Sequence, residues 1–253
     1  MNPRLLRHGR RAQLVVVHGM FGAPDDFLPL CERLVDVEVI GVDLPGHHDQ
    51  DAVAFADAAD QLRDVLDALP GAHLLGYSLG GRLALAAAVA GARPRTLTLV
   101  SSSAGLRDDD DRPARQRWDA RWAERLRQED AGRVHTDWLA QPLFGTLSTT
   151  QKEDAVNRRV QQSSVQLADA MEQMGQGHMP SLWAALERVP TPTLLVSGAR
   201  DDKYVHMHEH MAAAMPCAGR VVLAGLGHAV HVEDPDALAA ALLPHLLSAM
   251  EPS

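Results

Sequence analysis

Short apolar runs alternate with longer stretches of helical periodicity along most of the chain. Each run is rich in valine or leucine and leads into a loop that contains glycine or polar residues. Continuous apolar runs are typical of strands that are buried on both faces of a parallel sheet. The alternation therefore predicts an α/β fold with a mostly parallel central sheet and helices on both faces. The expected strands are residues 14–17, 37–42, 72–75, 96–100, 193–196 and 220–223.

The pattern changes between residues 107 and 189. This segment contains no strand-like run, and its apolar residues recur with the spacing of amphipathic helices. We expect a helical cap of residues 107–189, inserted after the strand 96–100 into a core formed by residues 1–106 and 190–253. Helices are predicted at residues 114–130, 151–162, 165–174 and 181–187.

Composition narrows the class of protein. The chain has 253 residues, enough for one large domain with an insertion, and a formal net charge of −9, which argues against a nucleic-acid surface. The two cysteines, Cys31 and Cys217, provide no disulfide framework. The N-terminal region has arginines but no apolar core of a signal peptide, and the longest apolar run, residues 83–90, is far too short to span a membrane. We expect a cytoplasmic protein without membrane insertion, and the oligomeric state stays open.

The motif Gly76-Tyr77-Ser78-Leu79-Gly80 joins an expected strand to an alanine-rich helical stretch. In this context a G-x-S-x-G motif forms a sharp turn that exposes the serine hydroxyl at the carboxyl end of the sheet. Serine becomes a nucleophile or base only with an imidazole and a supporting carboxylate. Ser78 is therefore the candidate catalytic serine, and the alternative is a glycine-rich turn that happens to contain serine.

The partners of Ser78 are expected in the order acid and then histidine, each in a loop after a later strand. Asp201 follows the strand 193–196, and we prefer it to its neighbour Asp202, which we expect to be solvated. His228 follows the strand 220–223. We prefer it to His231, which we expect to lie on the surface. The predicted triad is Ser78, His228 and Asp201.

A third loop is a candidate oxyanion hole. His18-Gly19-Met20-Phe21-Gly22 follows the expected strand 14–17, where a His-Gly loop supplies one backbone N–H. The other donor is the residue after the nucleophile. We assign the two donors to the amides of Met20 and Leu79. His18 is expected to hold the loop backbone rather than act as a second base.

Side chains of the expected cap suggest an anionic ligand. Basic and acidic residues balance between residues 107 and 160, whereas the rest of the chain is strongly acidic. Arginines placed over an active site favour a small anionic substrate. We expect Trp118 and Trp122 to pack onto the core. His206, His208 and His210 lack the supporting ligands of a metal site, so we expect neither metal nor cofactor.

The motifs taken together resemble a known family. Residues 76–82, 103–106, 112–123 and 137–144 are similar to the 2-succinyl-6-hydroxy-2,4-cyclohexadiene-1-carboxylate synthases of menaquinone biosynthesis, which have the α/β-hydrolase fold. The resemblance covers nearly the whole chain. Its implied activity is that of a lyase, in which the triad acts as a base and pyruvate leaves 2-succinyl-5-enolpyruvyl-6-hydroxy-3-cyclohexene-1-carboxylate.

The same resemblance implies a set of substrate-binding residues. Arg82, Arg115 and Arg159 look like the ligands of the substrate carboxylates, whereas Tyr77 and Trp138 look like the wall of the pocket. The choice between Arg159 and its neighbour Arg158 rests on an alignment without gaps, and it stays open.

Two other classes of function are compatible with parts of the sequence. A serine hydrolase that cleaves an ester, thioester or C–C bond of a small acidic metabolite would use the same triad and oxyanion loop. A non-catalytic binding module would show a broken triad or loop, and the sequence shows neither. The arginines of the expected cap favour the lyase over the hydrolase.

Overall fold

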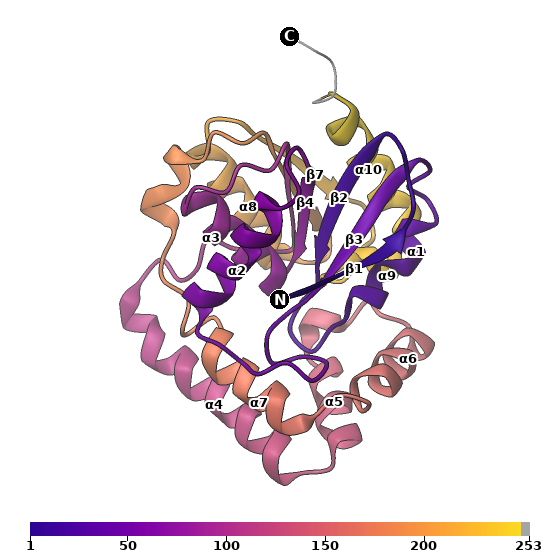
Figure 1. Ribbon diagram of the computed structural model, residues 1–253. Helices are drawn as coiled ribbons and strands as arrows, with labels where there is room; N and C mark the ends of the chain where they lie inside the picture. Colours follow the sequence, from indigo (N-terminus) through magenta and orange to yellow (C-terminus); the bar gives the residue numbers. More distant parts are fainter. Residues whose placement is uncertain (249–253) are drawn as a thin grey trace.

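A twisted sheet runs through the molecule in a computed structural model that describes residues 1–248 (Figure 1). Within these residues the sheet has seven strands in the order β1-β3-β2-β4-β5-β6-β7. Only β1 is antiparallel to its neighbour; the other pairings are parallel. The strands are β1 Asn2–Arg7, β2 Ala12–Val17, β3 Val37–Asp43, β4 His73–Tyr77, β5 Leu97–Val100, β6 Thr193–Gly198 and β7 Ala218–Leu223.

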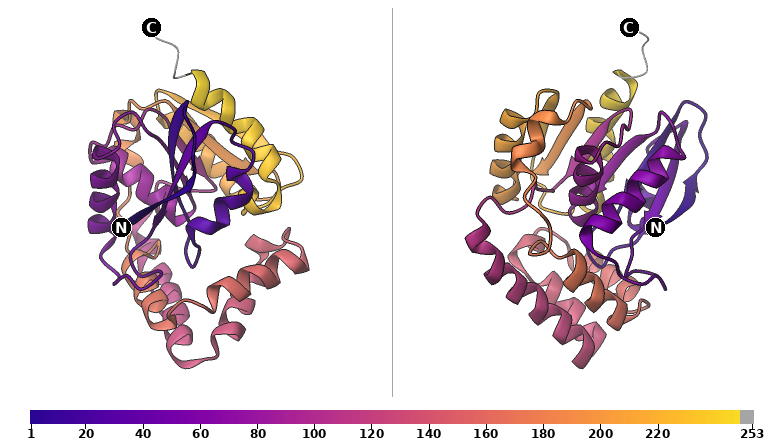
Figure 2. Two further views of the ribbon diagram at one scale, coloured as in Figure 1. Left: turned by 45° about the vertical axis from the view of Figure 1, so that its right-hand side comes forward. Right: turned by 60° about the vertical axis from the view of Figure 1, so that its left-hand side comes forward.

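An apolar core on each face of the sheet explains why the sequences of the central strands are continuous apolar runs. Val15 and Val17 of β2 pack toward helices α2 (Phe55–Asp67), α3 (Leu79–Val89) and α8 (Asp202–Ala214). Leu14 and Val16 of the same strand face the other layer, with α1 (Leu28–Cys31), α9 (Val230–Glu233) and α10 (Pro235–Ser248). The two groups of helices lie on opposite sides of the sheet (Figures 1 and 2). Successive side chains of a strand thus enter different cores.

The six expected strands are confirmed, and β1 is a seventh that the sequence did not reveal. Its residues are mostly exposed at the edge of the sheet, and its sequence is rich in arginine. An edge strand with one paired neighbour need not carry the apolar run that identifies a central strand.

The order of the strands determines where loops meet. From β2 the chain moves to β3 on one side, and it then returns to place β4 on the other side of β2. Ligands of open α/β sheets bind at such a switch point, outside the carboxyl ends of the strands. The loops after β2 and β4 therefore face each other across a crevice.

Helices fill the segment between β5 and β6, as expected. They lie together at one end of the sheet (Figure 1), and α4 packs against α7. Helix α5 was not predicted, and residues 181–187 form a 3-10 helix, Trp183–Arg188, instead of an α-helix. The cap boundaries at 107 and 189 remain a prediction. The helices are α4 Arg112–Gln128, α5 Ala131–Leu139, α6 Thr149–Arg159 and α7 Ser164–Met174.

Within residues 1–248, no helix combines the length and apolar character that crossing a bilayer requires. The cytoplasmic location stays a prediction.

Candidate active site

Ser78 occupies a strained turn between β4 and α3. Its φ of 50° and ψ of −107° lie in a region that L-residues other than glycine rarely adopt. The flanking glycines make the turn possible: a Cβ atom at Gly80 would collide with the backbone oxygen of Val17, and one at Gly76 with that of Gly80. The surroundings thus hold Ser78 where the G-x-S-x-G motif predicts it.

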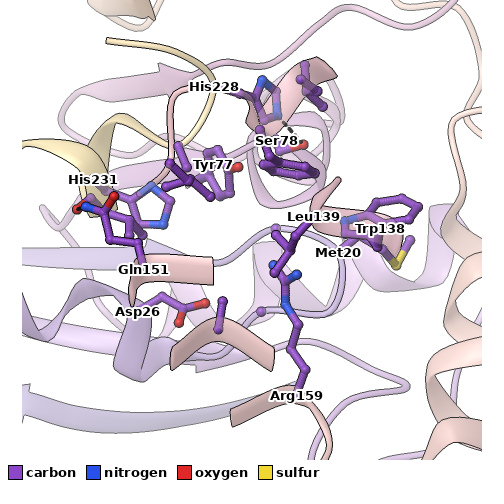
Figure 3. A pocket seen from close by; sticks show the side chains of 18 of the residues that line it. Met20, Asp26, Tyr77, Ser78, Trp138, Leu139, Gln151, Arg159, His228 and His231 are labelled. Atoms are coloured by element: carbon purple, nitrogen blue, oxygen red, sulfur yellow. Dashed lines mark hydrogen bonds between the residues drawn. The ribbon is translucent and has the colours of Figure 1, made fainter. Parts of the chain in front are cut away.

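A chain of hydrogen bonds links Ser78 to two other loops. His228 Nδ1 donates to Asp201 Oδ2 at 2.6 Å. Ser78 Oγ donates to His228 Nε2 at 3.4 Å (Figure 3). Asp201 and His228 are both buried. The carboxylate keeps the proton on Nδ1, which leaves Nε2 free to accept the serine proton. Asp202 is exposed, as expected of a solvated neighbour.

Three aromatic rings surround the His228 imidazole. Its ring centroid lies 4.8 Å from that of Tyr204, 5.3 Å from that of Tyr77 and 5.9 Å from that of Phe144. These contacts restrict rotation of the imidazole and limit the access of water to the hydrogen-bonded chain. Tyr204 was not identified from the sequence, although it lies on the first turn after Asp201.

The loop after β2 approaches Ser78 closely. A Cβ atom at Gly19 would lie 2.8 Å from Cε1 of Tyr77 and 3.4 Å from Cβ of Ser78, so only glycine allows this approach. Met20 lines the same cavity as Ser78. Leu79 is the first residue of α3, where backbone N–H groups lack partners inside the helix. Met20 thus lines the cavity onto which Ser78 opens, and Leu79 directly follows Ser78 in the chain; the role of their amides as oxyanion donors stays a prediction.

Two buried histidines hold the loop after β2, the candidate oxyanion loop. His18 Nδ1 donates to the Gly19 carbonyl at 2.8 Å, while its Nε2 accepts from the Leu44 amide at 3.2 Å. His47 Nε2 accepts from the Phe21 amide at 3.0 Å. Burial lowers the pKa of both imidazoles, which keeps them neutral. The predicted structural role of His18 is confirmed, and His47 shares it.

Two chambers meet at Ser78. Met20, Ser78 and Trp138 line both of them. We call one the Arg159 chamber; it also includes Tyr77, Leu139, Gln151, Arg159 and His231 (Figure 3). We call the other the Arg82 chamber; it also includes Arg82, Arg115, Gln176, Lys203 and Tyr204. All five residues predicted to bind substrate therefore line one chamber or the other.

The Arg82 chamber contains a buried cation. Arg82 is 7% exposed, and its Nη1 donates to the Met174 carbonyl at 3.3 Å. Burial, and next the charge of Arg115, lowers the pKa of Arg82 to about 10. Among residues 1–248 no carboxylate forms an ion pair with Arg82. Arg115 differs, because its Nε donates to the buried Asp119 carboxylate at 2.9 Å.

The Arg159 chamber contains a second cation, which is half-buried. Arg159 extends from the end of α6 into the pocket (Figure 3), and its Nη1 is buried with no hydrogen-bond partner among residues 1–248. Arg158 instead pairs with Asp26, with Nη2 at 3.1 Å from Oδ1. Of these two neighbours, only Arg159 has an unpaired charge facing the pocket.

The prediction that His231 lies on the surface is wrong. It is 2% exposed, and its ring packs between Tyr77 and Phe27, with centroids at 4.3 and 4.9 Å. Burial lowers its pKa to about 4. The short helix α9 turns residue 231 toward the pocket, and a helix of four residues leaves no recognisable periodicity in the sequence.

The three histidines of α8 do not converge on a metal. His206 and His210 are exposed, whereas His208 is buried with its Nε2 at 3.0 Å from the Ser102 carbonyl. Within residues 1–248, no group of three or more His, Cys, Asp or Glu side chains is arranged to hold a metal ion.

Comparison with known proteins identifies the class. A model of the alpha/beta hydrolase family matches residues 14–241, and the chain belongs to this family. It is 34% identical over 240 residues to the 2-succinyl-6-hydroxy-2,4-cyclohexadiene-1-carboxylate synthase of Yersinia pestis bv. Antiqua (strain Nepal516), which covers 92% of this chain and 86% of that one. This similarity confirms the resemblance seen in the sequence motifs and identifies the chain as an enzyme.

Solved structures agree with this assignment. MenH from S. aureus superimposes with a TM-score of 0.92 at 28% identity, over 98% of this chain and 99% of that one. An esterase from Thermogutta terrifontis has a TM-score of 0.83 at 23% identity, over 99% and 94% of the two chains. The esterase shares the α/β-hydrolase fold, and a fold alone does not define a reaction.

Proposed function

We propose that this protein is a lyase that eliminates pyruvate from 2-succinyl-5-enolpyruvyl-6-hydroxy-3-cyclohexene-1-carboxylate. The product is 2-succinyl-6-hydroxy-2,4-cyclohexadiene-1-carboxylate, the compound named in the description of its relatives. One observation carries the proposal: Ser78 lines both chambers, and each chamber contains an arginine, Arg82 or Arg159, that has no carboxylate partner among residues 1–248.

The first step is removal of the proton at C2 of the ring, next to the succinyl carbonyl. Ser78 Oγ takes this proton as it passes its own to His228 Nε2, and Asp201 stabilises the resulting imidazolium. The electrons of the C2–H bond move onto the succinyl carbonyl oxygen. The amides of Met20 and Leu79 stabilise the negative charge on this oxygen, because an oxyanion hole does so whether the cause is attack or deprotonation.

The second step breaks the bond between C5 and the enolpyruvyl oxygen. The electrons return from the oxyanion, the ring double bond moves to C2=C3, and a new double bond forms at C4=C5. The leaving enolate takes up a proton and becomes pyruvate, so atoms and charge balance without a cofactor. The imidazolium of His228 holds the proton that Ser78 passed on, and release of this proton restores the triad.

The arginines explain why elimination is favoured over hydrolysis of a neutral ester. Burying an unpaired guanidinium is costly, and a substrate with several carboxylates offsets that cost when it binds. Arg82 and Arg159 lie in different chambers, on either side of the reacting centre. Such a substrate is held at two ends with its C2 proton over Ser78, which is the positioning that the reaction requires.

The test is to identify the product. The purified enzyme is incubated with the enolpyruvyl substrate, and the mass and ultraviolet absorbance of the product are followed. The proposal predicts loss of one pyruvate and the appearance of a conjugated diene. A product that retains the enolpyruvyl group, together with rapid turnover of p-nitrophenyl esters, would instead identify a hydrolase.

A further inference from the structure

Tyr204 lies in the Arg82 chamber with its hydroxyl unused by the protein. Its side chain lines this chamber together with Ser78, and the residue is 8% exposed. Within residues 1–248, no hydrogen bond involves the Tyr204 hydroxyl. A nearly buried phenol with a free donor is uncommon, because buried tyrosine hydroxyls usually find a partner.

The element that positions the triad also positions Tyr204. Helix α8 begins at Asp202, directly after Asp201, and the Tyr204 amide donates to the Asp201 carbonyl at 2.9 Å. The Tyr204 ring packs on the imidazole of His228 with centroids 4.8 Å apart. One side of the phenol is therefore fixed against the triad while the side chain reaches into the chamber.

The surroundings of Tyr204 are cationic. Lys203 Nζ lies 5.5 Å from the centroid of its ring, and Arg82 and Arg115 line the same chamber. Tyr204 is near enough to Arg82 that it partly opposes the lowering of the Arg82 pKa by burial. An anion that binds Arg82 would thus lie within the environment of the phenol.

Arg82 cannot satisfy a carboxylate alone. Its Nη1 already donates to the Met174 carbonyl, and an ionised carboxylate has about four acceptor sites. We propose that the Tyr204 hydroxyl donates a hydrogen bond to the substrate carboxylate that Arg82 binds. Tyr204 is then a substrate-contacting residue that selects for an anionic group in this chamber, while its ring supports His228.

The inference rests on the proposed function for the identity of the substrate, but its test does not require turnover. Succinate serves as the probe, and its dissociation constant is measured by calorimetry in the Arg159→Ala background, so that binding reports on the Arg82 chamber. The four proteins are Arg159→Ala alone and Arg159→Ala combined with Tyr204→Phe, with Arg82→Ala or with both. Phenylalanine keeps the ring against His228 and removes only the hydroxyl.

The expected result is a loss of succinate affinity of about tenfold or more in Tyr204→Phe, as for a hydrogen bond to a charged group. Adding Tyr204→Phe to Arg82→Ala should then cause little further loss, because both residues hold one carboxylate. Equal affinity of Tyr204→Phe and its parent would overturn the proposal, as would fully additive losses. Failure of the enzyme to release pyruvate would contradict the proposed function and leave this comparison valid.

A second pair of variants separates the hydroxyl from the ring. In the otherwise unmodified enzyme, Tyr204→Phe should raise KM and leave kcat within about twofold, whereas Tyr204→Leu should lower kcat because His228 loses its support. A fall in kcat with unchanged KM in Tyr204→Phe would contradict the proposed contact.

Discussion

Arg158 and Arg159 are adjacent in sequence, yet only Arg158 pairs with the Asp26 carboxylate. Arg158 Nη2 lies 3.1 Å from Asp26 Oδ1, whereas Arg159 Nη1 is buried without a partner among residues 1–248. Both are at the end of α6, where consecutive side chains point about 100° apart around the helix. The difference assigns separate tasks to the two residues: Arg158 ties α6 to the core, and Arg159 offers its charge to the pocket.

Replacing Arg159 should therefore damage substrate binding far more than replacing Arg158. We expect Arg159→Ala to raise KM for the enolpyruvyl substrate by about tenfold to a hundredfold, the cost of one charge-assisted contact. Arg158→Ala, the matched control, should change KM by less than about threefold, because its pair with Asp26 is partly exposed. Steady-state kinetics of pyruvate release provide the measurement, and the reverse order of effects would refute the assignment.

Asp201 and Asp202 form a second matched pair. Asp201→Asn keeps the shape of the side chain but permits the wrong imidazole tautomer, so kcat should fall by about a thousandfold or more. Asp202→Asn should leave kcat unchanged, since the residue is exposed and the triad does not use it. Comparable losses of kcat in the two variants would contradict the assignment of Asp201 as the carboxylate that supports His228.

The backbone strain at Ser78 leads to a prediction about stability. Glycine adopts a φ of 50° without strain, whereas alanine does not. We expect Ser78→Gly to unfold with a free energy about 1 kcal/mol higher than Ser78→Ala, after allowing for the greater freedom of glycine in the unfolded chain. Both variants lack the hydroxyl and should be inactive. Denaturant titration checks the difference, and an advantage for alanine would mean that the turn carries no strain.

Sequence patterns predicted the parts of the fold that depend on local periodicity. Apolar runs located every central strand, and the glycines around Ser78 identified the turn because no other residue fits there. Strand β1 was missed because an edge strand needs no apolar run, and α5 was missed because it is short.

Side-chain environments depend on tertiary packing and were harder to predict. His231 and Tyr204 lie one turn away from predicted triad residues, yet the sequence does not show which face of α8 or α9 meets the pocket. The unpaired charge of Arg159 likewise follows from the position of Asp26, which is more than a hundred residues away in the chain. Sequence spacing can identify such residues as candidates, but only the folded structure distinguishes them from their neighbours.

Burial of His135 should make the stability of the folded protein depend on pH. It is fully buried, and neither ring nitrogen has a hydrogen-bond partner among residues 1–248. Burial, and next the charge of Arg159, lowers its pKa to about 4. Because the unfolded chain binds the proton at higher pH, stability should be lost as the pH falls below about 6.5 toward 4.

His135→Leu removes both the protonation cost and the unpartnered nitrogens. We expect a gain in unfolding free energy of about 1–3 kcal/mol near pH 8 and a larger gain near pH 5. His206→Leu is the control, because His206 is exposed and should give no such pH-dependent gain. Urea denaturation at the two pH values supplies the data. A gain that does not grow toward pH 5 would contradict the assignment of His135 as a neutral buried group.

The most direct test of the account measures pyruvate released from 2-succinyl-5-enolpyruvyl-6-hydroxy-3-cyclohexene-1-carboxylate, coupled to NADH oxidation by lactate dehydrogenase. The account predicts steady release by the unmodified enzyme and a rate at least about a thousandfold lower for Ser78→Ala. Release at the same rate by both proteins, or release no faster than in buffer, would contradict it.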